Sequence, residues 1–286
     1  MSHLAASLRS PAANPGLVRR AVGPGAPADH VGSRGRVGDG EGHRGGDLAR
    51  DPPDDAGGGG PRRSRFELAI FDLDGTLVDS VPDIAWALNQ TLAEEGRGPL
   101  TVAAVRDLVG DGARELVARA LAEPSSGGAR RVPNIDDCLA RFVGHYRSHV
   151  AVDTRLYPGI GPLLERLSHT AGLVLAVLTN KPKPITTPLL TYLGIAGYFA
   201  AVIGDGDGFQ HKPDPTAARR LIAECRTSVE HTVVIGDGLP DVRMAHAVGC
   251  ASISVTWGYV STAQLQAESP QWLASTAGDL ERLLIT

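Results

Sequence analysis

The sequence predicts an α/β protein, with a doubly wound parallel sheet and an inserted all-helical cap domain. After residue 65, short apolar runs alternate with helical stretches, as they do in doubly wound sheets. The runs are rich in Val, Ile and Leu and are not interrupted by polar residues, which is typical of strands buried on both faces of a parallel sheet. The segment 82–156 departs from this rhythm, because it shows helical stretches and no convincing strand.

The apolar runs are the predicted strands, at 68–71, 173–178, 201–203, 232–235 and 251–255. Helices are predicted at 215–225 and 240–248. Both begin with proline, which is favoured in the first turn of a helix, and Gly249 ends the second one.

Helical patterns fill the segment 82–156, and the predicted helices are at 83–95, 101–109, 113–122 and 135–149. Ile84, Leu88 and Leu92 give the first of these helices an apolar stripe. A helical insert after the first strand predicts a cap over the carboxyl edge of the sheet, where open α/β sheets bind ligands. We therefore expect a core made of 66–81 and 157–286 and a cap made of 82–156.

Composition excludes several classes of protein. A chain of 286 residues with 42% hydrophobic and 21% charged residues fits a soluble globular protein, and a net charge of −4 gives no reason to expect nucleic acid or a membrane surface as a partner. Cys138, Cys225 and Cys250 are far apart and form no CxxC pattern, which favours the reducing cytoplasm over a disulfide or zinc framework. We expect a cytoplasmic monomer or homodimer.

Residues 1–65 are rich in Gly, Pro, Ala, Arg and Asp. Such a segment buries too little apolar surface to offset the entropy of ordering its backbone, so it is predicted to be disordered. A flexible tail or a misassigned start codon explains it best. An organelle transit peptide is a weaker alternative, because acids, glycines and prolines interrupt the pattern.

Polar side chains follow the predicted strands: Asp72 and Asp74 the first, Thr179 and Asn180 the second, Lys212 the third, and Asp237 and Asp241 the fourth. Because the carboxyl ends of parallel strands meet at one edge of a sheet, we expect these groups to share one crevice. Several carboxylates beside one lysine need a compensating cation. Oxygen ligands without His or Cys favour Mg²⁺, which also accepts a substrate phosphate.

The pair Asp72 and Asp74 predicts phosphoryl chemistry. Residues i and i+2 at an extended strand end point the same way, so both carboxylates can face one reacting atom. One can attack phosphorus while the other handles the proton of the leaving group. Gly75 lets backbone N–H groups approach a phosphoryl oxygen closely. Thr179, the backbone of Asn180 and Lys212 can hold the other phosphoryl oxygens.

Taken in order, these residues resemble the four motifs of the haloacid dehalogenase superfamily: Asp72-Leu73-Asp74-Gly75-Thr76, Thr179, Lys212 and Gly236-Asp237-x-x-x-Asp241. The resemblance extends over 66–286, and the helical insert is similar to the type-1 cap of that superfamily. Within it the chain looks most like bacterial phosphoglycolate phosphatases, on the stretches Asp79-Ser80-Val81-Pro82-Asp83, Val109-Gly110-Asp111-Gly112-Ala113, Thr179-Asn180-Lys181-Pro182 and Thr256-Trp257-Gly258-Tyr259.

The resemblance implies a phosphoaspartate at Asp72 and general acid/base work at Asp74. It also implies Mg²⁺ held by the Asp72 carboxylate, the Asp74 carbonyl and the Asp237 carboxylate, with Asp241 in a supporting role. The chain departs from the family at Gly238, where Ser or Thr is common, so a hydroxyl close to the metal is absent.

The implied substrate is a small phosphate monoester, with 2-phosphoglycolate as the best candidate. Gly112 in the cap is a candidate substrate contact, and Arg114 is a candidate for binding a substrate carboxylate. A β-phosphoglucomutase-like enzyme, a pyrophosphatase and a non-catalytic regulatory module are the alternatives. The intact acids at 72, 74 and 237 argue against the last of these.

Overall fold

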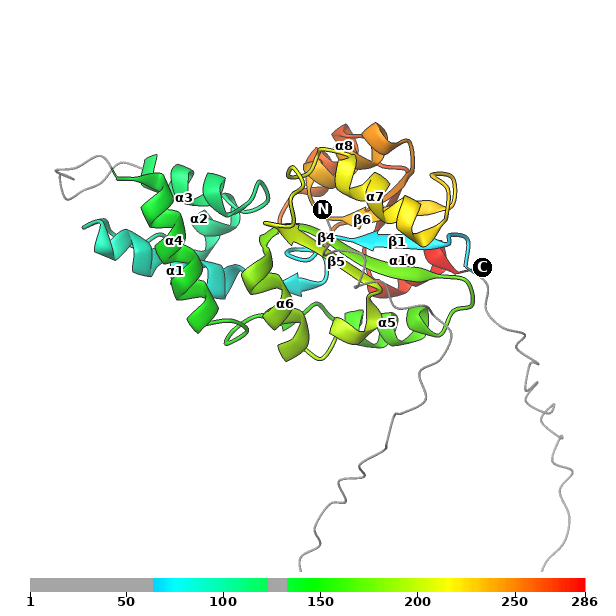
Figure 1. The fold of residues 1–286 in the computed structure, drawn as a ribbon, viewed down its shortest axis with the longest axis horizontal. Helices are drawn as coiled ribbons and strands as arrows, with labels where there is room; N and C mark the ends of the chain where they lie inside the picture. The colour runs from blue at the N-terminus through cyan, green and yellow to red at the C-terminus, as the bar shows by residue number, and fades with distance from the viewer. Residues whose placement is uncertain (1–63, 123–132, 286) are drawn as a thin grey trace, which may run out of the picture. The chain divides into compact units, whose positions relative to one another are not determined.

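The computed structural model describes residues 64–122 and 133–285, and its core is one six-stranded parallel sheet (Figure 1). In spatial order the strands are β5 (Ala201–Asp205), β4 (Val174–Pro182), β1 (Leu68–Phe71), β6 (Thr232–Gly236), β7 (Ala251–Val255) and β8 (Trp272–Ala274). Every neighbouring pair is parallel. The predicted parallel α/β fold is confirmed, and its order brings β1, β4 and β6 side by side although they are far apart in the sequence.

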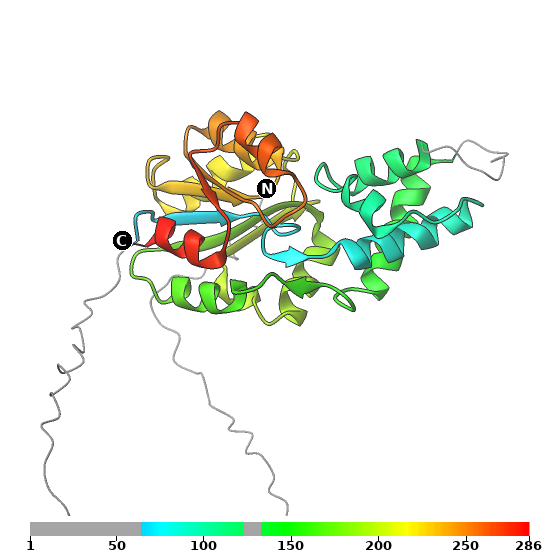
Figure 2. The same cartoon turned by 180° about the vertical axis from the view of Figure 1, so that it is seen from behind.

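Helices cover both faces of this sheet: α5 (Ile160–Ser168), α6 (Lys183–Tyr192), α7 (Thr216–Cys225), α8 (Leu239–Val248), α9 (Thr262–Ala267) and α10 (Ala277–Leu284), with the 3₁₀ turn η1 (Ala196–Tyr198). Figures 1 and 2 show α7 and α8 on one face, and α5 and α10 on the other. The central strand explains why both faces are apolar. Leu68 and Ile70 belong to the core under α7 and α8, whereas Ala69 and Phe71 belong to the opposite core.

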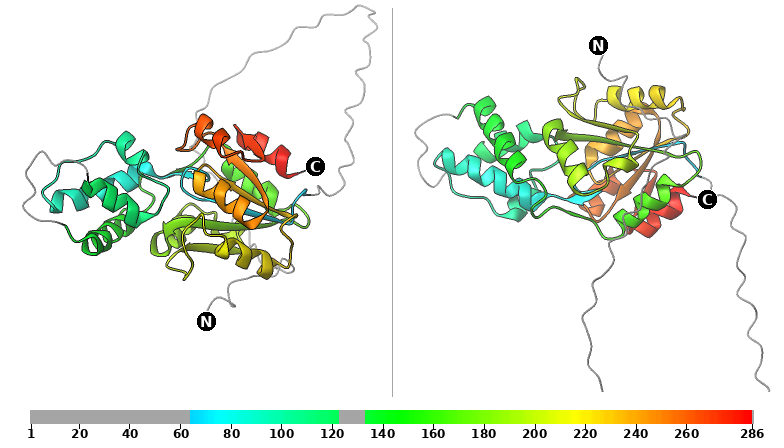
Figure 3. Two further views of the ribbon diagram at one scale, coloured as in Figure 1. Left: turned by 90° about the horizontal axis from the view of Figure 1, so that it is seen from above. Right: turned by 60° about the horizontal axis from the view of Figure 1, so that its bottom comes forward.

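The cap consists of α1 (Val81–Glu94), α2 (Val102–Arg106), α3 (Ala113–Ala122) and α4 (Ile135–Ser148), which gather into a group of their own (Figure 3). They enclose a separate apolar core that includes Leu88, Leu116 and Phe142. The chain enters and leaves the cap through a short antiparallel pair, β2 (Val78–Asp79) and β3 (Arg155–Leu156). β3 lies in a segment where no strand was predicted, because two residues that include an arginine form no apolar run.

Other bounds differ in ways that matter for the site. β4 continues to Pro182, so 179–181 belong to the strand itself rather than to the loop after it. The sixth strand, β8, was not predicted, since it is three residues long and only one of them is buried. The last two residues of the predicted disordered tail are ordered, because Ser64 forms a bridge with Ile285 and the Arg65 N–H donates to the Leu284 carbonyl at 3.0 Å. The other tail residues, 1–63, lie outside the described residues. Within the described ranges, no helix is both long enough and apolar enough to span a bilayer.

Candidate active site

The first group at the carboxyl edge of the sheet is an ion-paired set centred on Lys212. Its ammonium lies 2.8 Å from Asp72 Oδ1 and 2.7 Å from Asp241 Oδ1. Burial alone would lower the pKa of Lys212, but Asp241 and Asp72 outweigh it and the net shift is upward. Burial raises the pKa of Asp72 to about 6, with Lys212 opposing the shift and Asp241 adding to it. Asp72 is therefore mostly ionised at neutral pH, as a nucleophile must be.

Asp237 lies beside this set but has a different environment. Its carboxylate accepts hydrogen bonds from Thr76 Oγ1 at 2.9 Å and from the Tyr259 backbone N–H at 2.8 Å. Burial and the nearby Asp72 carboxylate raise the pKa of Asp237 to about 8. Gly75 makes room for it, because a Cβ built there would lie 2.1 Å from Asp237 Oδ2, and the φ of +85° at this position also favours glycine.

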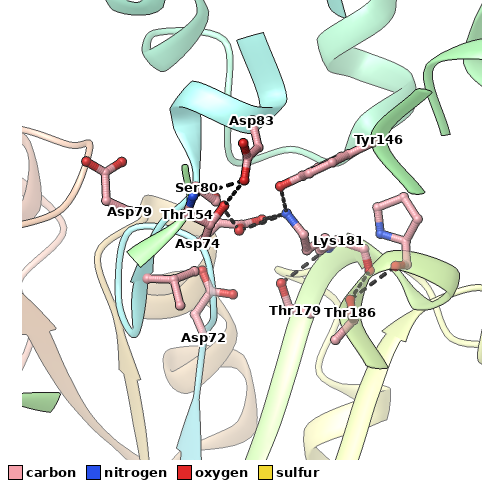
Figure 4. Close-up of polar contacts among 12 residues, drawn as sticks. Asp72, Asp74, Asp79, Ser80, Asp83, Tyr146, Thr154, Thr179, Lys181 and Thr186 are labelled. Carbon is pink, nitrogen blue, oxygen red and sulfur yellow. Dashed lines mark hydrogen bonds and ion pairs between the residues drawn. The ribbon is translucent and has the colours of Figure 1, made fainter. Parts of the chain in front are cut away.

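A second lysine, Lys181, holds the carboxylate of Asp74 (Figure 4). Lys181 Nζ lies 2.9 Å from Asp74 Oδ1 and 3.0 Å from Oδ2, and Ser80 Oγ donates to Oδ1 at 2.5 Å. The same ammonium donates to Tyr146 Oη of the cap helix α4 at 2.6 Å. Sequence reasoning gave no role to Lys181, Tyr146 or Ser80. For Lys181 a signal existed, since it lies two residues after Thr179 and therefore on the same side of β4.

Asn180 joins three segments by its side chain. Its Oδ1 accepts from the Lys212 backbone N–H at 2.8 Å, and its Nδ2 donates to the Lys212 carbonyl at 3.3 Å and to the Gly110 carbonyl of the cap at 3.1 Å. This side chain was not predicted to do structural work, because only its backbone was assigned to phosphate. Thr179 Oγ1 accepts from the Lys181 N–H at 3.2 Å, which leaves the hydroxyl proton for another acceptor.

Four predicted residues of the core and one of the cap line a single pocket between the sheet edge and the cap. Asp72, Asp74, Thr179 and Asn180 line it, together with Gly112 from the cap and the unpredicted pair Lys181 and Tyr146. Its apolar wall consists of Ile84, Val109, Ala113, Leu116 and Phe142. Lys212 and Asp241 lie just behind Asp72, through the ion pairs given above.

Of the two contacts predicted from the cap, the structure does not bring Arg114 to this pocket. Its side chain is 52% exposed and pairs with Asp136 at the start of α4. Gly112 by contrast lies against the core: its φ is +97°, and a Cβ there would come within 2.7 Å of His211 Cε1. The cap loop therefore approaches the core through a glycine rather than through the arginine that follows it.

The donor set fits a divalent cation. Asp72, Asp237 and Asp241 offer carboxylate oxygens within 4.8 Å of one another. Adding Asp74, four carboxylates face two ammonium groups, so two negative charges stay unbalanced when all are ionised. Among the described residues no lysine, arginine or histidine pairs with Asp237, and its raised pKa is the expected result of that missing positive charge. Mg²⁺ suits such an all-oxygen set.

Comparison with known proteins gives consistent matches. The model of a family described as haloacid dehalogenase-like hydrolase matches residues 69–255. The phosphoglycolate phosphatase of Agrobacterium fabrum is 40% identical over 204 residues, which cover 70% of this chain and 85% of that protein. The phosphoglycolate phosphatase of Vibrio cholerae is 36% identical over 228 residues, which cover 77% of this chain and 97% of that protein.

Solved structures agree with these matches. A crystal structure of a predicted phosphoglycolate phosphatase from Haemophilus somnus superposes with a TM-score of 0.71 at 30% identity, covering 77% of this chain and 98% of that one. The CbbY protein of Rhodobacter sphaeroides, solved in complex with phosphate, superposes with a TM-score of 0.64 at 25% identity, covering 75% of this chain and 96% of that one.

Proposed function

The chain belongs to the haloacid dehalogenase-like hydrolase family, and from that premise we propose that it is a Mg²⁺-dependent phosphatase that hydrolyses 2-phosphoglycolate to glycolate and phosphate. One observation carries the proposal. Asp72 and Asp74, two residues apart in the sequence, line the same pocket while each is ion-paired to a different buried lysine. Relatives that are 40% and 36% identical to this chain over most of their own length bear the name of that activity.

The carboxylates divide the chemistry between them. The Asp72 carboxylate attacks phosphorus, and the bond between phosphorus and the ester oxygen breaks as the new bond forms. Asp74 gives its proton to the departing glycolate oxygen, which leaves as a hydroxyl. Asp74 then accepts a proton from the water that attacks the phosphoaspartate, which releases phosphate and restores the ionised Asp72 and the protonated Asp74. This reuse of one acid/base group explains why a second carboxylate is needed at all.

The transferred phosphoryl group needs donors around its oxygens. Lys212 supplies positive charge next to Asp72, the Thr179 hydroxyl has a proton to donate, and the backbone N–H of Asn180 is the further donor that we assign. The Gly75 N–H donates to the Val78 carbonyl at 2.8 Å, so Gly75 makes room for Asp237 and does not itself bind phosphate. Because Thr179 and Asn180 belong to β4, a central strand of the sheet, these donors are fixed before the substrate arrives.

Mg²⁺ would be held by the carboxylates of Asp72 and Asp237 and by the backbone carbonyl of Asp74, with Asp241 in support. When bound, it supplies positive charge that screens the phosphoryl oxygens from the attacking carboxylate. Asp241 would lie within reach of the same ion, because its carboxylate is grouped with those of Asp72 and Asp237. Its negative charge is balanced by Lys212 at 2.7 Å.

The cap and the free thiols complete the proposal. Apolar side chains of the cap wall the pocket, so that water other than the reacting molecule is kept from the phosphoaspartate.

Cys138, Cys225 and Cys250 are all unpaired thiols, which supports a reducing cytoplasmic location. The partner that we propose is a small-molecule ester rather than a macromolecule.

The test is turnover by the purified protein of 2-phosphoglycolate, β-glucose 1-phosphate, pyrophosphate and p-nitrophenyl phosphate, with Mg²⁺ and with a chelator. We expect the highest kcat/KM for 2-phosphoglycolate and no turnover with the chelator. Asp72→Asn should lower kcat by at least about 10⁴-fold, since the nucleophile is lost, while the fold is kept. Asp207→Asn is the matched control, because Asp207 follows β5 at the same sheet edge but pairs with Lys183 outside the pocket.

Each rival would give a different result. If kcat/KM were highest for the sugar phosphate or for pyrophosphate, the proposed substrate would be wrong, and the proposed phosphoryl transfer to Asp72 would stand. Absence of turnover with every compound would leave a binding module, and full activity of Asp72→Asn would remove the nucleophile assignment.

A further inference from the structure

Lys181 is a buried cation in a place where the chemistry described so far does not require one. Its side chain is 2% exposed, and it is the only lysine or arginine among the described residues that line the pocket. The second buried lysine of the site, Lys212, lies on the phosphoryl side between Asp72 and Asp241. The two ammonium groups thus serve different carboxylates: Lys212 pairs with Asp72 from behind the pocket, and Lys181 pairs with Asp74 in the pocket wall.

The position of Lys181 is fixed from both domains. From the core, Asp74 accepts two contacts from its ammonium, at 2.9 and 3.0 Å. From the cap, the Tyr146 hydroxyl accepts a third at 2.6 Å (Figure 4). Burial and the nearby carboxylates of Asp74 and Asp83 raise the pKa of Tyr146, so the phenol stays neutral and keeps a proton of its own to donate.

The part of a substrate that lies beyond the phosphoryl group would meet these two side chains next. The rest of the pocket wall on the cap side is apolar, with Ile84, Leu116 and Phe142 among its members. A carboxylate placed there without a cation would bear the full cost of losing its water. Arg114 offers no help, because it faces solvent and pairs with Asp136.

We propose that Lys181, assisted by the Tyr146 hydroxyl, binds a carboxylate on the leaving group of the substrate and so selects small phosphate esters that carry a second anionic group. This inference rests on the proposed phosphatase function. In the complex the ammonium is shared by Asp74 and the substrate carboxylate, so that recognition of the leaving group takes place beside the residue that protonates it.

The test compares two substrates that differ only in the group concerned. Ethyl phosphate has a methyl group where 2-phosphoglycolate has its carboxylate. In Lys181→Met the ratio of kcat/KM for 2-phosphoglycolate to that for ethyl phosphate should fall by about 30-fold or more, because truncating one partner of a buried charge pair costs that much. Any disturbance of Asp74 lowers both rates and cancels in this ratio.

Binding of phosphonates gives a second readout that needs no turnover. 3-Phosphonopropionate is the non-hydrolysable analogue with the carboxylate, and propylphosphonate is the analogue without it. By titration calorimetry, Lys181→Met should weaken binding of the first by about 30-fold or more and change binding of the second little. Lys181→Arg, which keeps the charge, should recover part of the loss.

Two tyrosines near Asp74 form a matched pair. Tyr146→Phe should lower the substrate ratio by several-fold, since one neutral hydrogen bond to the carboxylate is lost. Tyr259→Phe should leave the ratio unchanged, because the Tyr259 hydroxyl contacts the Ser80 backbone and does not line the pocket.

The outcomes separate this inference from the proposed function. Equal losses for both substrates and both phosphonates in Lys181→Met would overturn the carboxylate assignment and leave the phosphatase intact. A wild-type protein that hydrolyses ethyl phosphate as well as 2-phosphoglycolate would also overturn it. Absence of phosphatase activity on any ester, together with tighter binding of 3-phosphonopropionate than of propylphosphonate, would overturn the function and keep the site.

Discussion

At the scale of single residues, Asp237 shows how the site is prepared for a cation. Its oxygens accept two neutral hydrogen bonds, from Thr76 and from the Tyr259 backbone, and it is only 3% exposed. Two such bonds do not offset the loss of hydration and the repulsion from Asp72, which is why its pKa rises to about 8. The ionised form therefore becomes stable only when positive charge arrives.

This environment predicts how stability depends on pH. The ordinary pKa of an aspartate is 3.8, whereas in the folded protein the pKa of Asp237 is about 8. Between these values the folded state binds more protons than the unfolded state, so in a chelator the melting temperature should fall as pH rises from about 5 to about 8. Mg²⁺ favours the ionised form, and its stabilising effect should grow over the same range.

Melting curves at pH 6, 7 and 8, with chelator and with Mg²⁺, measure both trends. Asp237→Asn removes the titrating group and should flatten the curve above pH 6, where Asp72, with a pKa of about 6, contributes little more. A wild-type protein that becomes more stable with rising pH in the chelator, relative to Asp237→Asn, would contradict the assignment.

The sequence predicted the ionisable residues of the site better than their partners. Asp72, Asp74, Asp237 and Lys212 each directly follow an apolar run or have a place in an ordered motif, so their convergence follows from the parallel sheet. Tyr146 is different, because it lies in an amphipathic cap helix where its spacing fits an ordinary core position. Arg114 was predicted to bind a substrate carboxylate, but it pairs with Asp136 instead. That pairing depends on how α3 and α4 pack, which no local sequence pattern records.

At the scale of elements, the return of the chain from the cap is fixed by one buried carboxylate on α1. Asp83 has no exposed surface and accepts hydrogen bonds from the backbone N–H groups of Asp153 and Thr154, both at 2.9 Å, and from Thr154 Oγ1 at 2.7 Å. His149 lies 3.6 Å away and stacks on Trp86 of the same helix. The start of α1 is thereby tied to the segment that leads into β3.

Replacing this carboxylate should destabilise the protein. Asp83→Ala leaves the N–H and hydroxyl of Thr154 buried without an acceptor and the N–H of Asp153 part-buried without one, so we expect a loss of about 2–4 kcal/mol in the free energy of unfolding. Urea denaturation measures it. Asp107→Asn is the control, because Asp107 is an exposed acid in the same cap and should change stability by less than about 0.5 kcal/mol. Equal effects of the two substitutions would show that Asp83 does not hold the cap in place.

Among the elements, apolar strands and capped helices could be read from the sequence, and short edge elements could not. β1 and β7 were predicted with the bounds they have, since four or five consecutive apolar or small residues suit a buried strand. β8 and the β2–β3 pair are two or three residues long and partly exposed. Their pairing is decided by tertiary contacts, and no local pattern records it.

At the scale of the whole molecule, the cap and the core have to meet in one arrangement for the pocket to be complete. Two side chains of β4 make that connection. Lys181 reaches Tyr146 of α4, and Asn180 reaches the Gly110 carbonyl of the cap while it also clamps the backbone of Lys212. The loop that carries Gly112 is thus held to the same residue that positions the phosphate-side lysine.

Removing the Asn180 amide should loosen the cap from the core and displace Lys212 together. We expect Asn180→Ala to raise KM by about tenfold or more, since both the cap loop and the phosphoryl donors lose a fixed position, and to increase hydrogen exchange at 109–113. Asn89→Ala is a matched control. Asn89 also makes a donor and an acceptor bond, at 2.9 and 2.8 Å, but both go to Leu100 inside the cap. Asn89→Ala should lower the free energy of unfolding by about 1–3 kcal/mol and leave KM unchanged.

Equal increases in KM for the two substitutions would mean that a weakened cap causes the effect. The contacts of Asn180 with Gly110 and Lys212 would then have no separate part in closing the pocket.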